Sequence, residues 1–227
     1  MAQYNVWEKE YRNPRFMSRD LKAQKFIQRF YKFLKKEGVE VEGSKILDLG
    51  SGTGRNANYF ARLGAKVVAI ELSETALAIG KKQAEKENLS VEYIQGSIGE
   101  KYNFSDNYFD VVIDATASNS LNEAEREIYL EEVKRVLKPA GIFFVRALCL
   151  DGDKNAKKLL KLNPGKEKDT YVMPGVELVE RVFSEEDFRE IYGSNFEILE
   201  LEKISGYTSF AGQSYKRNFF ISYLRNN

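Results

Sequence analysis

The chain has 227 residues, with 35 Lys and Arg against 34 Asp and Glu, and a net charge of +1 does not indicate bulk phosphate binding. It has no histidine and one cysteine, Cys149, which excludes Ser-His-Asp and Cys-His catalysis, an internal disulfide and a zinc site of the usual kind. No apolar run reaches the roughly 18 residues of a membrane span, and no secretory leader is evident, so we expect a cytoplasmic protein without a membrane partner.

The first 38 residues combine an aromatic, charged segment with an amphipathic helix. Trp7, Tyr11 and Phe16 are scattered among charges, in a segment too polar for a core strand. From residue 18 to residue 37 apolar side chains recur every three or four positions, and Gly38 is a natural helix end. We expect this helix to cover one face of a sheet.

Residues 45–72 read KILDLGSGTGRNANYFARLGAKVVAIEL, which predicts a strand, a turn, a helix and a second strand. The first strand is a short apolar run typical of a buried parallel strand. Gly50, Gly52 and Gly54 allow a turn through conformations that a side chain would obstruct, so a ligand can approach bare backbone. The helix begins near Arg55, and its free N–H groups therefore face the same crevice.

Two carboxylates in this segment indicate the class of ligand. Glu71, at the tip of the second strand, is placed to accept hydrogen bonds from the vicinal hydroxyls of a ribose. Dinucleotide enzymes use G-x-G-x-x-G, but Arg55 stands where the third glycine of that pattern belongs. Asp48, just before the glycines, would repel a pyrophosphate and attract an ammonium or sulfonium group. The segment therefore predicts a site for a positively charged nucleoside.

Asp48, the three glycines and Glu71 resemble the first two motifs of class I S-adenosylmethionine-dependent methyltransferases. The segment NYFDVVIDATASNSL resembles the fourth strand of that family, and EEVKRVLKPAGIFFVRA resembles its helix, turn and fifth strand. The resemblance covers residues 39–147 and implies a three-layer, Rossmann-like α/β fold. Its seven-stranded sheet would be mostly parallel, with the last strand antiparallel and helices on both faces.

The resemblance also implies S-adenosyl-L-methionine as the cofactor and S-adenosyl-L-homocysteine as the product. It implies that the cofactor contacts come from Asp48, Gly50, Ser51, Gly52, Gly54, Asn56, Glu71, Leu72, Ser97, Ile98 and Asp114.

The N-terminal Trp-x-x-x-Tyr, formed by Trp7 and Tyr11, is similar to the start of small-molecule methyltransferases of the tellurite-resistance and related types. That similarity implies a lid over the cofactor, from which Tyr11 would reach the donor or the acceptor, as a base or as a substrate contact. The alternative is that these aromatic side chains anchor the N-terminal tail to the domain.

Beyond Glu71, Ser73 is a good N-cap for a helix that reaches about residue 87, and residues 91–94 form the third strand. The family often has an acidic residue after this strand to accept from the adenine amino group, whereas this chain has Ser97. We expect the Ser97 hydroxyl or a backbone carbonyl to replace it, with Ile98 packed on the ring.

The strand at residues 109–115 has Asp114 near its carboxyl end, where doubly wound folds bind ligands. Asp114 is therefore expected to contact the methionine amino group or the acceptor, or to act as a catalytic base. Residues 115–121 contain no Asn-Pro-Pro-Tyr-like element, which in this family marks enzymes that act on adenine or on glutamine amide nitrogen. Those acceptors are not expected here.

An amphipathic helix at residues 125–137 precedes the fifth strand, at residues 142–148. Arg146 lies near the carboxyl end of this strand, where it either holds an anionic acceptor or pairs with a carboxylate at the rim. Residues 151–183 are rich in lysine and lack a sustained apolar period until residue 176. We expect this insertion to cap the acceptor site, with lysines that attract an acidic substrate or form a solvated face.

Ser184 is a predicted N-cap, and two final strands at residues 196–204 and 219–224 form a hairpin. The Gly/Ser/Tyr-rich loop expected between them holds Tyr207, a candidate substrate contact. The chain thus reads as a single methyltransferase domain over residues 1–227. Its predicted parts are a lid and helix at 1–38, a cofactor-binding core at 39–150, the insertion at 151–183, and a helix and hairpin at 184–227.

The expected function is transfer of a methyl group to a small-molecule acceptor by in-line displacement, carried out by a monomer or a homodimer without a nucleic-acid partner. Three different readings stay open. The acceptor could be RNA or protein, the chain could be an NAD-dependent oxidoreductase, or it could bind the cofactor without catalysis.

Overall fold

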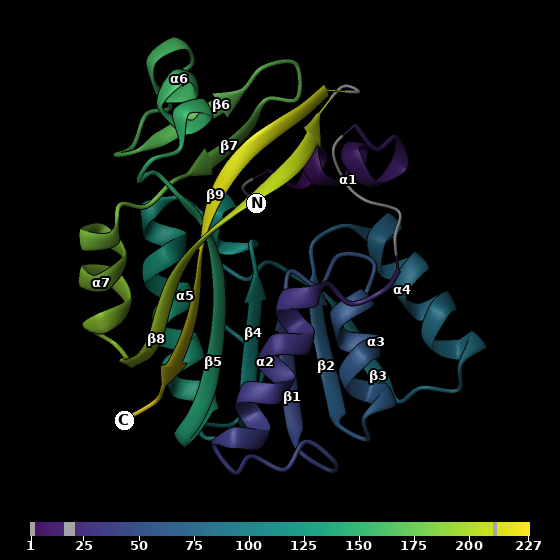
Figure 1. The fold of residues 1–227 in the computed structure, drawn as a ribbon. Coiled ribbons are helices and arrows are strands. Elements are labelled where there is room, and N and C mark those ends of the chain that lie inside the picture. Colours follow the sequence, from purple (N-terminus) through teal and green to yellow (C-terminus); the bar gives the residue numbers. More distant parts are fainter. Residues whose placement is uncertain (1–2, 16–20, 211–212) are drawn as a thin grey trace.

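The structure, a computed structural model that describes residues 3–15, 21–210 and 213–227, is built around a seven-stranded sheet (Figure 1). The strand order is β3-β2-β1-β4-β5-β9-β8. These strands are β1 (Lys45–Leu49), β2 (Lys66–Glu71), β3 (Val91–Gln95), β4 (Phe109–Ala115), β5 (Leu137–Cys149), β8 (Glu197–Phe210) and β9 (Gln213–Arg225). Strands β1 to β5 pair in parallel, and β9 runs antiparallel to both β5 and β8. The predicted fold class is confirmed.

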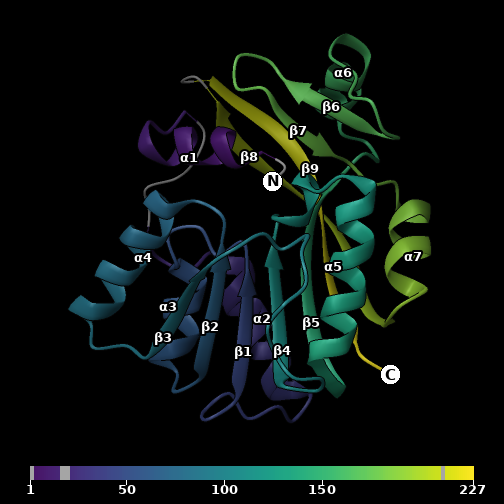
Figure 2. The same ribbon diagram turned by 180° about the vertical axis from the view of Figure 1, so that it is seen from behind.

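Helices cover both faces of the sheet (Figures 1 and 2). One face carries α2 (Lys25–Lys36), α3 (Arg55–Arg62) and α4 (Glu74–Lys86), and the other carries α5 (Glu123–Val136) and α7 (Glu185–Gly193). Within the described part of the chain, no helix is long and apolar enough to cross a bilayer.

The alternation of side chains along each strand divides the core between the two faces. On β1, Leu47 and Leu49 belong to the cluster that holds the buried side chains of α5 and α7, whereas Ile46 belongs to the cluster of α2, α3 and α4. On β5, Phe143 joins the first cluster and its neighbour Phe144 joins the second. Strands that are apolar on both sides are therefore buried on both sides, as the continuous apolar runs predict.

Side-chain caps set the starts of α4, α5 and α7. Ser73 accepts a hydrogen bond from the backbone N–H of Ala76 at the start of α4, and Ser184 does the same at α7, which confirms both predicted N-caps. Asn122 and Glu125 form a capping box, so α5 begins at residue 123, two residues earlier than predicted.

The N-terminal part of the chain forms two helices. The aromatic segment forms α1 (Tyr4–Arg12), which we call the lid, and α2 begins at Lys25. The helix predicted from residue 18 is thus confirmed only from residue 25 onward, and residues 16–20 lie outside the described part of the chain.

The insertion, which we call the cap (residues 151–183), has more secondary structure than its composition suggests. It contains α6 (Lys154–Leu162) and a small hairpin of β6 (Thr170–Met173) and β7 (Leu178–Arg181). Tyr171 packs with Leu148 of β5 and Phe219 of β9 in a core of its own. The sparse apolar residues of the cap suffice because they pack against the main sheet.

The final hairpin also differs from the prediction. The expected loop is strand, because β8 and β9 stay paired from Ser205 with Asn218 to Phe210 with Gln213. Backbone pairing needs no apolar pattern, so a polar Gly/Ser/Tyr-rich sequence continues the ladder. The hairpin thereby extends past the sheet, beside the cap and the lid (Figure 1).

Candidate functional site

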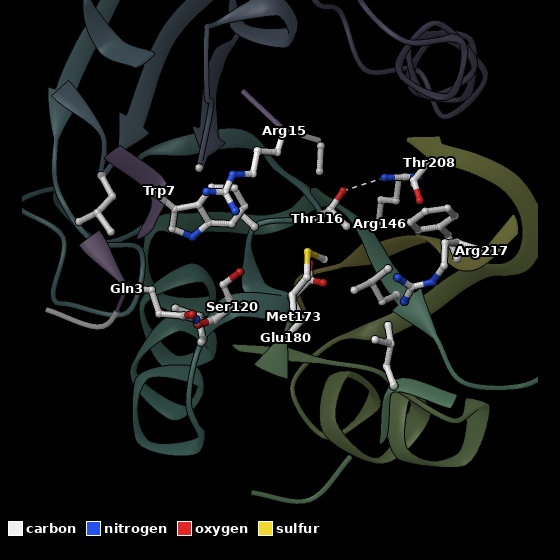
Figure 3. Close-up of a pocket in the computed structure, with 18 of the residues that line it drawn as sticks. Gln3, Trp7, Arg15, Thr116, Ser120, Arg146, Met173, Glu180, Thr208 and Arg217 are labelled. Atoms are coloured by element: carbon white, nitrogen blue, oxygen red, sulfur yellow. Dashed lines mark hydrogen bonds between the residues drawn. The ribbon is translucent and has the colours of Figure 1, made fainter. Parts of the chain in front are cut away.

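A cavity of about 910 Å³ lies at the carboxyl edge of the parallel strands (Figure 3). Its floor comes from the segments that follow β1, β2, β3 and β4 and from the end of β5. The lid, the cap and the extended β8–β9 hairpin supply the remaining walls. In Figure 3, Gln3 and Trp7 lie on one side of the cavity, and Arg146 and Arg217 lie on the other. This position is where doubly wound folds bind ligands.

The glycine turn (residues 50–54) needs each of its glycines for a separate reason. All three have left-handed backbones, with φ of +64° at Gly50, +57° at Gly52 and +74° at Gly54. A Cβ on Gly50 would lie 2.3 Å from the Cβ of Ala117, and one on Gly54 would lie 2.0 Å from the hydroxyl of Tyr93. Gly50 lines the cavity, whereas Gly52 and Gly54 shape the turn behind it.

Glu71 connects the end of β2 to the glycine turn. Its Oε2 accepts a hydrogen bond of 2.8 Å from the Gly52 N–H, and its Oε1 accepts one of 2.8 Å from the Ser73 N–H. Burial raises the pKa of Glu71, while these backbone bonds act in the opposite direction. The carboxylate lines the cavity, so its predicted contact with ribose hydroxyls stays a prediction that the geometry supports.

Asp48 lies beneath the turn and outside the cavity wall. Its side chain is 1% exposed, and its Oδ2 has no hydrogen-bond partner among the described residues. Burial raises the pKa of Asp48 to about 7; a hydrogen bond from Ala57 opposes the shift, and the charges of Asp114 and Glu71 reinforce it. Three neighbouring carboxylates with an unpaired oxygen fit a ligand that carries positive charge, as predicted for a sulfonium nucleoside.

Asp114, a predicted ligand contact and candidate base, forms its hydrogen bonds within the protein. It is fully buried and lies outside the cavity wall. Its carboxylate accepts hydrogen bonds from the N–H groups of Ala117 and Ser118 and from the Tyr129 hydroxyl, at 2.7 Å for Ala117 and Tyr129. These bonds fix the loop after β4 and the short helix η1 (Ser118–Ser120). Because no part of Asp114 faces the cavity, we propose a structural role for it in place of a base or a direct ligand contact.

The remaining predicted cofactor contacts divide into two groups. Leu72, Ser97 and Ile98 line the cavity next to Glu71, because the Gly96 N–H donates to the Glu71 carbonyl at 3.1 Å. Ser51 and Asn56 are buried outside the wall, and each has a side-chain oxygen without a hydrogen-bond partner in the described ranges. The first group borders a ligand space directly, while the second supports the turn.

The lid is held at its middle and at its N-terminal end. In the middle of α1, Glu8 accepts hydrogen bonds of 2.6 Å from the hydroxyls of Ser73 and Thr75, at the N-terminus of α4. At the N-cap position, Gln3 Nε2 donates to the Val179 carbonyl at 2.9 Å, and Gln3 Oε1 accepts from the Val179 N–H at 2.6 Å. The lid therefore bridges α4 and the cap.

Tyr11 lines the cavity from the lid, as the predicted lid requires. Burial raises the pKa of Tyr11 well above its ordinary value, and the charge of Glu71 adds to the shift. A phenol that holds its proton so firmly suits a hydrogen-bond donor better than a base. Tyr207 was predicted as a substrate contact, as were Tyr11 and Arg146. It is 75% exposed and lines the cavity from the β8–β9 hairpin.

Arg146 lines the cavity, and no ion pair with a carboxylate is found for it among the described residues. Its Nη1 donates to the Thr116 hydroxyl at 2.8 Å (Figure 3). The predicted pairing of Arg146 with a carboxylate at the rim is therefore not observed in the described part of the chain.

A chain of polar residues joins the cap to the β8–β9 hairpin, and sequence reasoning missed it. Glu180 lines the cavity and accepts a hydrogen bond of 2.8 Å from the Tyr171 hydroxyl, which accepts one of 3.0 Å from Arg217. Arg217 also pairs with Asp153 at 2.9 Å, where Asp153 caps α6. The sequence signal was the N-cap pattern at Asp153 alone, since the other partners lie far apart in the chain.

Comparison with known proteins agrees with this geometry. Residues 46–141 match the model of a family described as "Methyltransferase domain". An uncharacterized methyltransferase of Schizosaccharomyces pombe is 35% identical over 104 residues, which cover 45% of this chain and 70% of that protein. An uncharacterized methyltransferase of Synechocystis is 36% identical over 101 residues, or 44% of this chain and 45% of that protein. The matched part of the chain thus spans about half the length of several curated relatives.

The fold is also found among solved structures. The 1,6-didemethyltoxoflavin-N1-methyltransferase of Burkholderia thailandensis, crystallised with 1,6-didemethyltoxoflavin and S-adenosylhomocysteine, superposes with a TM-score of 0.73 at 17% identity. The superposition covers 99% of this chain and 87% of that one. From the matched family, the relatives and the fold together, the chain belongs to the methyltransferase-domain family of class I S-adenosylmethionine-dependent methyltransferases.

Proposed function

We propose that this protein transfers a methyl group from S-adenosylmethionine to a small-molecule acceptor held under the cap. The observation that carries the proposal is the cavity itself, which Gly50 and Glu71 border on the core side and Glu180 borders on the cap side. Pockets for small ligands measure roughly 300 to 1,000 Å³, so about 910 Å³ gives room for a donor and a small acceptor side by side.

On the core side, Glu71, Leu72 and Ile98 would hold the nucleoside, and the glycine turn would lie against the methionine portion. The bound cofactor supplies a methyl group already activated on a sulfonium sulfur. The work left to the protein is therefore to align the acceptor and to exclude water. The neighbouring carboxylates of Asp48, Asp114 and Glu71 together add a favourable field for positive charge.

On the acceptor side, enclosure favours a small molecule. The lid, the cap and the β8–β9 hairpin surround the cavity, and Gln3 joins the lid to β7 of the cap. A macromolecule would have to reach the donor through these three elements. The structurally similar Burkholderia enzyme was crystallised with a small compound and S-adenosylhomocysteine together, which supports the same class of acceptor here.

Glu180 is the side chain that we propose to accept a proton from the acceptor. Of its two carboxylate oxygens, Oε2 accepts from Tyr171, and the residue faces the cavity beside Met173 (Figure 3). Burial raises the pKa of Glu180, although the charge of Arg217 and the Tyr171 hydroxyl act against the shift. A carboxylate with a raised pKa is a better base at neutral pH than an exposed one.

Labelled methyl transfer tests the proposal. The protein is incubated with methyl-labelled S-adenosylmethionine and either the small-metabolite filtrate or the macromolecular fraction of a cell extract. Label should enter the filtrate, and Glu71→Ala should reduce it by weakening cofactor binding by about 1 to 3 kcal/mol. Label in the macromolecular fraction alone would establish RNA or protein as the acceptor.

Calorimetry distinguishes a methyltransferase from an oxidoreductase. S-adenosylhomocysteine should bind and NAD should not, whereas the reverse result would indicate an oxidoreductase. For a labelled acceptor, Glu180→Gln should lower kcat while S-adenosylhomocysteine affinity stays unchanged, with Glu125→Gln, at another cavity-lining carboxylate, as the matched control.

A further inference from the structure

The guanidinium group of Arg146 lies against two aromatic rings and a hydroxyl group. Its guanidinium carbon lies 3.5 Å from the centroid of the Phe219 ring and 4.9 Å from that of Phe26, and its Nη1 donates to the Thr116 hydroxyl. Two aromatic rings and one hydroxyl therefore restrict a planar, charged group at the cavity wall.

Thr116, which accepts the hydrogen bond from Arg146, has a strained backbone. Its φ is +81°, a left-handed conformation that is strained for a β-branched residue, by about 1 to 3 kcal/mol. Asn119 Nδ2 donates to the Thr116 carbonyl at 3.3 Å and thereby helps to hold the strained backbone. A strained backbone of this kind persists only where the surrounding contacts hold it in place, and such residues are common at ligand sites.

The charge of Arg146 lacks the compensation that comparable arginines have. Arg181 and Arg217 are buried, and each pairs with an aspartate at 2.9 Å. Arg146 is half-buried and forms no such pair in the described part of the chain, and its buried Nε has no hydrogen-bond partner there. A guanidinium that is partly removed from water and left without a counter-charge is unfavourable, and an anionic ligand would relieve that cost.

The local electrostatics point the same way. Burial lowers the pKa of Arg146 to about 9, and the positive charge of Arg55 lowers it further. Arg55 itself donates to Gln24 at 2.7 Å. The charge of Arg146, with which no carboxylate of the described residues pairs, therefore favours an anion at this part of the cavity wall.

We propose that the acceptor is a small carboxylic acid with an apolar body, whose carboxylate pairs with Arg146 while Leu148, Met173 and Phe219 border the rest. This inference rests on the proposed function, because it names the substrate class of that same cavity. A carboxylate matches the planar fork of one arginine, whereas a phosphate is usually held by several donors and cations. The apolar side chains on the wall suit a hydrocarbon or aromatic body.

The test is calorimetric titration of benzoate and of its neutral analogue benzamide into the protein saturated with S-adenosylhomocysteine. Benzoate should bind at least about tenfold more tightly than benzamide. In Arg146→Met this preference should disappear. In Lys158→Met, which removes another cation of the cavity wall, it should remain. Equal binding of the two probes, or a preference that survives Arg146→Met, would overturn the inference.

Two further readouts keep the result unambiguous. If S-adenosylhomocysteine fails to bind the wild-type protein, the proposed function fails; if it binds and the benzoate preference is absent, only the carboxylate inference fails. Should Arg146→Met not fold, Arg146→Gln, which keeps a polar side chain but removes the charge, takes its place. A benzoate preference that survives in Arg146→Gln contradicts the inference.

Discussion

The hydroxyl of Tyr11 lies over Gly52 so closely that a Cβ on this glycine would be 2.6 Å from the phenolic oxygen. The lid thus packs directly on the turn that the sequence identified as the cofactor site. The second nearest atom to that Cβ position is a ring carbon of Tyr11, at 3.5 Å, an ordinary contact. Of these two atoms of Tyr11, only the hydroxyl oxygen would therefore clash with a Cβ at position 52.

Gly52→Ala should loosen the lid through two separate effects. A side chain at φ +57° costs about 1 to 2 kcal/mol, and the clash with the Tyr11 hydroxyl adds to this. In a Tyr11→Phe background the clash is absent, so the same substitution should cost less. Amide exchange of the lid in the four proteins measures the coupling, and additive effects would show that the two residues do not touch.

Glu8→Gln should release the lid from α4 by weakening hydrogen bonds to a charged acceptor, a loss of roughly 1 to 3 kcal/mol. Burial acts to raise the pKa of Glu8, but the bonds from Ser73, Thr75 and Arg12 outweigh it and bring the pKa to about 2 from 4.5. The contribution of the Glu8 carboxylate to the stability of the folded protein is therefore complete above pH 4.5 and is lost as the pH falls towards 2.

The measurement for Glu8 is amide exchange of residues 4–12 together with S-adenosylhomocysteine affinity at neutral pH. Glu92→Gln, at an exposed position on β3, serves as the control. A lid equally protected in Glu8→Gln and in wild type would show that Gln3 and Tyr11 hold it alone.

Asp48→Asn should stabilise the unliganded protein at alkaline pH. The pKa of Asp48 is about 7 in the folded chain against 3.8 as the reference, so the folded state binds the proton more firmly. Stability from this residue is therefore present at low pH and declines as the pH rises from about 4 to 7. The variant should gain roughly 2 to 4 kcal/mol above pH 7 and little near pH 4, measured by urea unfolding.

The same variant tests the electrostatic role of Asp48. S-adenosylmethionine carries a sulfonium charge that S-adenosylhomocysteine lacks, so loss of the carboxylate charge should weaken the first ligand more than the second. Calorimetry with both ligands gives the ratio of affinities. A ratio unchanged by Asp48→Asn would remove the sulfonium assignment and leave Asp48 as a structural residue.

Arg217→Met should destabilise the protein by about 3 to 5 kcal/mol, because it leaves the buried carboxylate of Asp153 without its partner. Arg189→Met breaks an exposed pair with Glu185 and should cost less than about 1 kcal/mol. Urea unfolding compares the two variants. Similar small losses in both would mean that the cap does not depend on this pair.

Features that depend on neighbours in sequence were predictable. Asp48, the glycines and Glu71 lie within one strand-turn-helix-strand unit, so their spacing and charge predicted a positively charged nucleoside and carried the methyltransferase resemblance that implied the cofactor. The N-caps Ser73 and Ser184 were predictable for the same reason, since a cap bonds to a residue three positions ahead.

Features that depend on distant partners were not predictable. Asp114 stands at a strand end like a ligand contact, but Tyr129 and the loop after β4 use its carboxylate. The polar residues around Tyr207 read as a loop, because the backbone pairing of β8 with β9 leaves no apolar signature.

The sequence by itself determined the fold class and the cofactor, because both depend on short-range patterns of glycine, charge and apolar residues. The tertiary structure alone decided which side chains line the cavity next to the cap. Glu180, Tyr171 and Arg217 meet across the cap and the final hairpin, and Arg146 lies between the rings of Phe26 and Phe219. Such sites form when the chain brings together residues that are far apart in sequence, and no local pattern records which side chains will meet.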